Sequence, residues 1–188
     1  NNTAARAGGG LHSVDSAVNI VGSLFDGNTS TAGDDGGVSL SGSATVGVVD
    51  DVTFTNNFAG SDGGAIRALN ATVSIEGVRN RDVIHNRASV QGGAIALENS
   101  TVTLNNLDIA DNTSNGDGGA IALSGTTNLV LSATTLDNNQ ASDQGGALYN
   151  VASGNQQLVD ATFTQNRAVS DGGAIAHNTA AGSLSVRN

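Results

Sequence analysis

The 188-residue sequence contains no cysteine, methionine, proline, tryptophan or lysine. Without cysteine, neither a disulfide framework nor a cysteine-based metal site can form. Because glycine adopts positive φ at no steric cost, a glycine-rich chain without proline indicates many tight turns rather than collagen or polyproline structure. No run of 18 apolar residues is present, so the sequence predicts no membrane-spanning helix in this segment.

Aromatic residues make up only 3% of the chain, and its hydrophobic residues, 38%, are mostly alanine, valine, leucine and isoleucine. The core must therefore be built from many small, regular contacts. The net charge is −10, and aspartate far outnumbers glutamate among the acids. Because such a chain repels polyanions, we expect no nucleic acid partner, and calcium or a basic partner fits the charge better.

Two motifs recur in phase along the chain. Gly-Gly pairs recur with spacings of 28, 27, 29, 26, 27 and 27 residues, starting at Gly8. The later pairs predict glycine corners at Gly36, Gly37, Gly63, Gly64, Gly92, Gly93, Gly118, Gly119, Gly145, Gly146, Gly172 and Gly173. An apolar residue followed three positions later by asparagine predicts a second column at Asn28, Asn57, Asn86, Asn112, Asn139 and Asn166. Such regularity is the signature of a solenoid.

Each unit of about 27 residues holds three short β-type runs, illustrated by 92–97, 101–104 and 51–57. The pattern predicts an all-β fold, a right-handed three-sided parallel β-helix of about seven coils, with residues 1–188 as a single domain. Equivalent side chains would then stack about 4.8 Å apart. The sequence begins within the pattern, so we expect it to be a fragment or a processed part of a longer chain.

The stacking assigns a role to each column. The asparagines should turn inward and bond to one another and to the turn backbone. The aliphatic residues after the glycines should fill the interior, and the flanking alanines should face outward as a smooth, uncharged strip for lateral contact with another rod. This predicted strip comprises Ala94, Ala96, Ala120, Ala122, Ala174 and Ala176.

The alternation of "GGAI" or "GGAL" (63–66, 92–95, 118–121, 145–148 and 172–175) with "FxxN" (25–28, 54–57 and 163–166) resembles the polymorphic membrane proteins first described in chlamydiae. That resemblance implies a β-helical stalk carried to the cell surface by a C-terminal autotransporter barrel. Several members of that family act as adhesins. The resemblance therefore implies an extracellular or outer-surface location and a host or matrix ligand.

Two groups of residues are candidate chemical sites. Asp35 and Asp62 precede glycine pairs on adjacent coils, so they are candidate ligands for a shared Ca²⁺, although aspartate is also a good turn residue facing water. The longest coil, residues 63–91, contains a cluster of charged residues, which is typical of a solvated bulge. They are Glu76, Arg79, Arg81, Asp82, His85 and Arg87.

The sequence therefore predicts a non-enzymatic extracellular repeat protein that serves as an adhesin stalk or as a self-associating fibre subunit. Its partner is then either a surface ligand or another copy of itself, in end-to-end or lateral contact. No cofactor is expected other than calcium. The alternative is a carbohydrate-active β-helix enzyme, a polysaccharide lyase or hydrolase, with Asp82 and Arg81 as its candidate residues.

Overall fold

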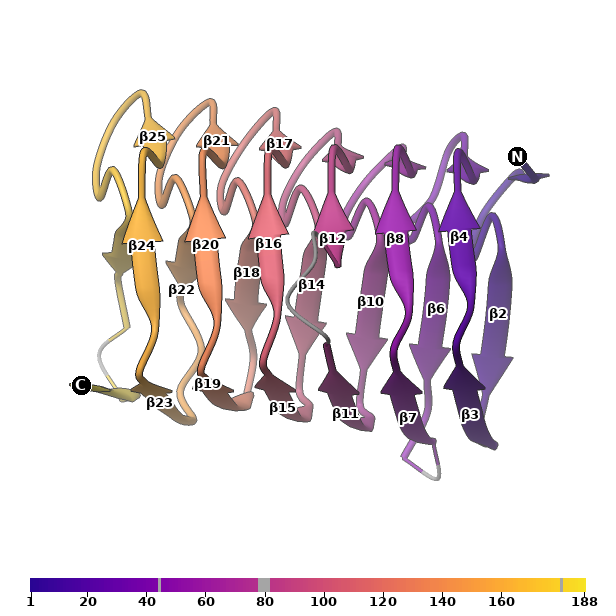
Figure 1. The fold of residues 1–188 in the computed structure, drawn as a ribbon, viewed down its shortest axis with the longest axis horizontal. Helices are drawn as coiled ribbons and strands as arrows, with labels where there is room; N and C mark the ends of the chain where they lie inside the picture. The colour runs from indigo at the N-terminus through magenta and orange to yellow at the C-terminus, as the bar shows by residue number, and fades with distance from the viewer. Residues whose placement is uncertain (44, 78–81, 180) are drawn as a thin grey trace.

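The computed structural model describes residues 1–43, 45–77, 82–179 and 181–188. In these ranges the regular elements are β-strands, which pair in parallel into four sheets running the length of a rod (Figure 1). Each coil crosses the sheets in the order B, C, D and A. Among these residues no helix is long and apolar enough to cross a membrane.

Sheets B and C carry the longer strands, which form the back and the lower edge of the rod in Figure 1. Sheet B comprises β2 (Leu11–Val14), β6 (Val38–Ser41), β10 (Ile66–Leu69), β14 (Ile95–Glu98), β18 (Ile121–Ser124), β22 (Leu148–Asn150) and β26 (Ile175–His177). Sheet C comprises β3 (Ala17–Val21), β7 (Val46–Asp50), β11 (Thr72–Glu76), β15 (Thr101–Asn105), β19 (Asn128–Ser132), β23 (Asn155–Val159) and β27 (Ser183–Arg187).

Sheets D and A carry shorter strands and form the front and the top of the rod in Figure 1. Sheet D comprises β4 (Leu24–Asp26), β8 (Thr53–Thr55), β12 (Val83–Ile84), β16 (Asp108–Ala110), β20 (Thr135–Asp137) and β24 (Thr162–Thr164). Sheet A comprises β1 (Thr3–Ala4), β5 (Thr29–Ser30), β9 (Phe58–Ala59), β13 (Arg87–Ala88), β17 (Thr113–Ser114), β21 (Gln140–Ala141) and β25 (Arg167–Ala168).

The all-β solenoid predicted from the sequence is confirmed, with one addition. The sequence predicts three runs per coil, whereas the structure has a fourth strand directly after each asparagine of the predicted column. These sheet A strands are only two residues long. A two-residue strand is too short to show an alternation of apolar and polar residues, which is why the sequence pattern missed it.

The core is a set of stacked apolar files. Ile66 pairs with Ile95, and Ile95 pairs with Ile121, in exact register between neighbouring strands of sheet B. All three side chains are fully buried. Phe25 and Phe54 stack with ring centroids 5.2 Å apart. One coil cannot bury its own interior, so each depends on the coils above and below it.

All four corners of the coil use left-handed backbone, which explains the abundance of glycine, asparagine and aspartate. Positive φ recurs at equivalent positions after sheet D, namely Gly27, Asn56, His85, Asp111, Asn138 and Gln165. The corner after sheet B has positive φ at Asp15, Gly42, Asn70, Asn99 and Gly125. The corner after sheet C has positive φ at Gly22, Asp51, Asn106, Ala133 and Asp160. The corner before sheet B uses Gly8, Asp35, Gly63, Gly92, Gly118, Gly145 and Gly172.

The second glycine of each pair has a different function from the first. Its φ is not positive, but a Cβ at Gly119 would overlap the carbonyl oxygen of Gly146 in the next coil. Gly36 and Gly64 meet the same obstacle. This position therefore requires glycine because the backbones of neighbouring coils approach closely there.

The structure corrects the predicted register of the second coil. Val38 pairs with Ile66, so Asp35 stands opposite Gly63 and Gly36 opposite Gly64. Gly37 is consequently opposite Ala65 and is not the second glycine of the corner. Aligning the Gly-Gly pairs of the sequence places this coil one residue out of its observed register. In the structure Asp34, and not Asp35, stands opposite Asp62.

Candidate functional site

The predicted asparagines lie in one file along the rod, which is buried from Asn28 to Asn139 and partly exposed at Asn166, and Asn2 extends it into the first coil. At each step two donors converge on one acceptor. For Asn86, the backbone nitrogen lies 2.9 Å and Nδ2 lies 3.1 Å from Oδ1 of Asn112. The same Nδ2 lies 3.0 Å from the carbonyl oxygen of Phe54 in the preceding coil. The file thus satisfies the turn backbone and links three coils.

The amides of the file all point the same way. Asn28 donates to Asn57, and the same donation repeats from Asn57 to Asn86 and along the rest of the file. The last described step runs from Asn139 to Oδ1 of Asn166, at 3.0 Å. Aligned hydrogen bonds of this kind polarise one another, so the file acts as one directional network.

The alanines do not form the exposed strip that the sequence predicts. Ala94 and Ala120 lie inside the hydrophobic core, fully buried. Ala96, Ala122 and Ala176 are also less than a tenth exposed. Ala96 and Ala122 form part of a narrow trough along sheet B that is also lined by Asp62, Arg67, Gln91 and Glu98. The prediction of an outward-facing strip is therefore wrong for Ala94 and Ala120, which lie in the core. Ala174 is partly exposed.

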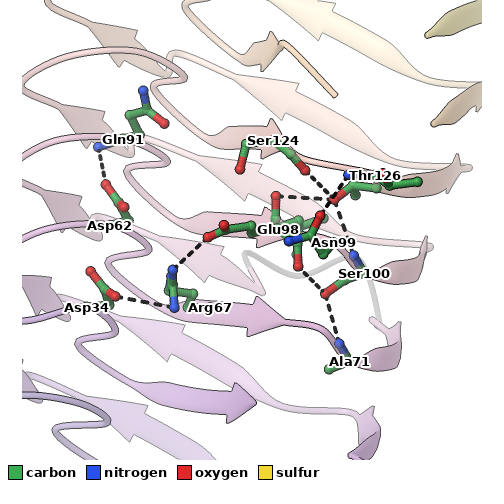
Figure 2. Close-up of polar contacts among 12 residues, drawn as sticks. Asp34, Asp62, Arg67, Ala71, Gln91, Glu98, Asn99, Ser100, Ser124 and Thr126 are labelled. Carbon is green, nitrogen blue, oxygen red and sulfur yellow. Dashed lines mark hydrogen bonds and ion pairs between the residues drawn. The ribbon is translucent and has the colours of Figure 1, made fainter. Parts of the chain in front are cut away.

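The wall of this trough is an aspartate–glutamine row, formed by the residues that precede the glycine corners. Its members are Asp34, Asp62, Gln91, Asp117, Gln144 and Asp171. The backbone nitrogen of Gln91 lies 3.0 Å from Oδ1 of Asp62 (Figure 2), and its Nε2 lies 3.4 Å from Oδ2 of Asp117. Neutral glutamines alternate with aspartates from Asp62 onward, which keeps like charges apart.

Asp34 and Asp62 are the two members with no glutamine between them, and Arg67 lies beside them (Figure 2). Arg67 Nη1 lies 3.3 Å from Oδ2 of Asp34, and its Nη2 lies 2.9 Å from Oε2 of Glu98. The arginine side chain is only 16% exposed. It therefore connects three coils by charge, at the point where the row would otherwise be most repulsive.

Asp35 is a buried acid in a glycine position. It is 1% exposed with a φ of 68°, and its Oδ1 has no hydrogen-bond partner among the described residues. Burial raises the pKa of Asp35 to about 8, and the charges of Asp34 and Asp62 act in the same direction, against a hydrogen bond from Ser39. Most of this carboxyl is therefore protonated at neutral pH.

Three other groups along the aspartate–glutamine row and sheet B have shifted pKa. Burial raises the pKa of Asp62, and the charge of Asp34 raises it further. Burial also raises the pKa of Asp117. The pKa of Tyr149 is raised by burial and then by the charge of Asp117. These shifts all favour the protonated form, so these three groups retain protons more tightly than free side chains do.

The calcium prediction rested on Asp35 and Asp62 at equivalent positions of adjacent coils, and the structure places them at different positions. Among the described residues, no group of three or more histidine, aspartate or glutamate side chains is placed to hold a metal ion.

The described charged residues of the longest coil are spread around the coil. Arg79 and Arg81 lie outside the described residues. Asp82 is 1% exposed, and its Oδ2 accepts a hydrogen bond from the backbone of Asp108 at 2.8 Å. Of the others, Glu76 ends a strand of sheet C, whereas His85 and Arg87 lie at the bend between sheets D and A.

A groove that the sequence analysis did not identify lies at the bend between sheets D and A. Its volume is about 350 Å³. It is lined by Asp111, Thr113, Asn138, Asn139, Gln140, Gln165 and Arg167. All seven of these residues belong to columns that repeat once per coil. The signal in the sequence was the polar residue on each side of the asparagine column, which reads as turn composition when taken alone.

The comparisons with known proteins agree with this architecture. A family model described as "Right handed beta helix region" matches residues 10–188. No curated protein matches the chain significantly. No solved structure matches it significantly either.

Proposed function

The chain belongs to the right-handed β-helix family, and on that premise we propose that it is a non-enzymatic structural rod of an extracellular or cell-surface repeat protein. In this role it is either an adhesin stalk or a self-associating fibre subunit. The observation that carries the proposal is the unbroken pairing of sheets A, B and C from the first coil to the last.

The internal bonding supports a mechanical role. Each coil is joined to the next by parallel strands on its faces, by the Asn file and by close backbone contacts at the glycine corners. Solenoids of this type transmit force along one axis because every coil contacts only its neighbours. A stalk or a fibre needs this property, and a compact globular fold does not provide it.

The resemblance to the polymorphic membrane proteins gives the rod a cellular context. The paired "GGAI" and "FxxN" motifs occupy the glycine corner and the Asn file, the two features that set the register of this rod. On this proposal the chain is a passenger segment displayed outside the cell. A stalk would hold a binding region away from the membrane, whereas a fibre subunit would associate with other copies.

The Asn file gives a specific reason to consider self-association. Its donors face one way, so a further coil with an asparagine in the same place extends the network by the same two bonds that link Asn86 to Asn112. Coils from a second copy have the correct residue spacing to do so.

Sedimentation velocity and negative-stain microscopy of the purified chain test the proposal. A fibre subunit forms filaments as concentration rises, and a stalk remains an elongated monomer. Asn166→Lys places a charge on the last described step of the file and should stop filament growth. Asn155→Lys adds the same charge on the exposed face of sheet C and should not. A compact particle with no elongation contradicts both versions.

The second candidate is a carbohydrate-active enzyme, and one observation favours it. Asp62 and Asp117 flank the sheet B trough with raised pKa, and Arg67 lies between Asp34 and Glu98. General acids in glycosidases and lyases need such shifts. Turnover of polygalacturonate that Asp62→Asn abolishes and Asp160→Asn preserves would favour this candidate. If no neutral or acidic polysaccharide is degraded, the structural role stands.

A further inference from the structure

The groove at the bend between sheets D and A is built from two parallel rows of side chains. One row follows sheet D at the left-handed corner, and the other faces outward from sheet A. The corner row comprises Asn56, His85, Asp111, Asn138 and Gln165. The sheet A row comprises Phe58, Arg87, Thr113, Gln140 and Arg167. Each coil contributes one residue to each row, so both rows repeat at the strand spacing of about 4.8 Å.

The left-handed backbone of the corner row explains why its side chains are available. A residue with positive φ ends the sheet D strand, and the next residue enters the buried Asn file. Asn138 and Gln165 have φ of 51° and 53°, and both are exposed. Gln140 and Arg167 in the facing row are exposed as well.

Part of the corner row is held in place by its own contacts. Asn138 Nδ2 donates to Oδ1 of Asp111 at 2.7 Å, and His85 Nε2 lies 3.5 Å from the other Asp111 oxygen. By contrast, the side chains of Gln140, Gln165 and Arg167 make no hydrogen bond or ion pair with the described residues. The groove therefore has a fixed floor and three polar side chains that are free to bind a ligand.

The chemistry of these side chains selects the ligand. Amides present a donor and an acceptor together, which suits neighbouring hydroxyl groups that both donate and accept. Arg167 is balanced within the groove by Asp111, and the whole chain carries a charge of −10. A polyanion would be repelled by that charge. A polycation would be drawn instead to the aspartate–glutamine row at the opposite end of sheet A. With polyanions and polycations excluded, the groove fits a neutral, hydroxyl-rich ligand.

The repeat of the rows selects its shape. A ligand that makes the same contacts on consecutive coils must itself be extended and repetitive, with its long axis parallel to the rod. The aromatic face of Phe58, with Arg87 lying 5.8 Å above the ring centroid, extends the sheet A row beyond the groove. The groove volume of about 350 Å³ is within the range of small-molecule sites and accommodates a short segment of such a chain.

We propose that this groove binds a neutral polysaccharide strand, with sugar rings placed along successive coils between the corner row and the sheet A row. This proposal names a ligand class for the proposed stalk. It rests on the proposed function in one respect, because the two rows keep their spacing only if the rod is rigid. A separate measurement of rod length and stiffness therefore distinguishes failure of the binding proposal from failure of the rod.

Isothermal titration calorimetry with cellohexaose, xylohexaose and chitohexaose tests the proposal, with hexagalacturonate as the acidic comparison. At least one neutral hexamer should bind, with an affinity that does not change with salt. The double variant Gln140→Ala, Gln165→Ala should weaken that binding by about tenfold or more. The matched variant Gln157→Ala, Asn155→Ala changes exposed amides on sheet C and should leave the affinity unchanged. All four side chains are exposed, so the variants should keep the fold.

Three results would overturn the proposal. The first is no heat with any neutral hexamer up to about 10 mM, the weakest affinity that a useful multivalent site would show. The second is equal loss in the groove variant and in the sheet C variant. The third is preferential binding of hexagalacturonate that falls with salt, which would assign the groove to an acidic ligand.

Discussion

Asp35 and Gly63 occupy the same corner of consecutive coils, with φ of 68° and 69°. Glycine holds that corner in the other coils, where it also has positive φ. Asp35 therefore combines left-handed backbone with a buried carboxyl that has one unpartnered oxygen. The coil tolerates this residue because the carboxyl can take up a proton.

This protonation makes stability depend on pH in a defined direction. The pKa of Asp35 is about 8 in the folded chain and near 3.8 when unfolded, so the folded state holds a proton that the unfolded state has released. The proton-linked stability is complete below about pH 4 and is lost as pH rises toward 8. Urea unfolding at a series of pH values should show the midpoint falling across that window.

Replacing Asp35 should remove most of this dependence. Asp35→Gly restores the residue found in the other coils, and Asp35→Asn keeps the side-chain shape without a titrating proton. Both should raise the free energy of unfolding at pH 7 by about 1–3 kcal/mol, because the unpartnered buried acid is gone. Asp160→Asn changes an exposed corner aspartate with φ of 51° and should leave the pH slope as it is. An unaltered slope in Asp35→Gly would contradict the assignment.

The Asn file should be the most sensitive polar feature of the rod. Asn112→Ala would leave both donors of Asn86 without their acceptor and would remove the donations to Val83 and Asn139. We expect a loss of about 3 kcal/mol or more in the free energy of unfolding. Asn155→Ala, on the exposed face of sheet C, should change stability by less than about 0.5 kcal/mol. A similar loss of unfolding free energy in both variants would contradict a particular contribution of the Asn file to stability.

The two kinds of corner glycine should respond differently to an added methyl group. Gly119→Ala places a Cβ against the carbonyl of Gly146, which is backbone and cannot move without separating the coils. The expected cost is about 3 kcal/mol. Gly22→Ala meets no atom within 4 Å, so its cost is only the left-handed strain of about 1 kcal/mol. Chemical denaturation of the two variants compares them directly.

Ala133 is a site for stabilisation. It has φ of 48°, a conformation that disfavours a Cβ. Ala133→Gly should raise the free energy of unfolding by about 0.5–1 kcal/mol, since relief of strain exceeds the added chain entropy. Ala161→Gly, at a position without positive φ, should lower it. Thermal unfolding of the pair checks the sign, and destabilisation by both changes would contradict it.

The fold could be predicted from the sequence because every coil needs the same residue types at the same positions. The glycine corner and the apolar residue three positions before each asparagine recur in every coil, so the period and the parallel stacking followed from spacing alone. The fourth sheet did not follow, because a strand such as Phe58–Ala59 is too short to show a pattern.

The candidate sites were less accessible to prediction than the fold. Assigning Asp35 to its column required the pairing of Val38 with Ile66, which the repeated glycines at 36 and 37 obscured. The inward direction of Ala94 depended on the exact bend of the corner. The groove between Gln140 and Gln165 required both rows to be placed in space, since the sequence shows only polar residues in turns.

Distances between spin labels along one column of sheet C test the central claim that the coils stack in step into a stiff rod. The chain has no cysteine, so introduced cysteines are unique labelling sites. Asn19→Cys paired in turn with Val130→Cys, Gln157→Cys and Ser185→Cys spans four, five and six strand steps in the observed register. Narrow distributions whose means rise by about 4.8 Å per step, near 19, 24 and 29 Å, are predicted. Broad distributions, or distances that do not increase with the number of coils, would contradict the account.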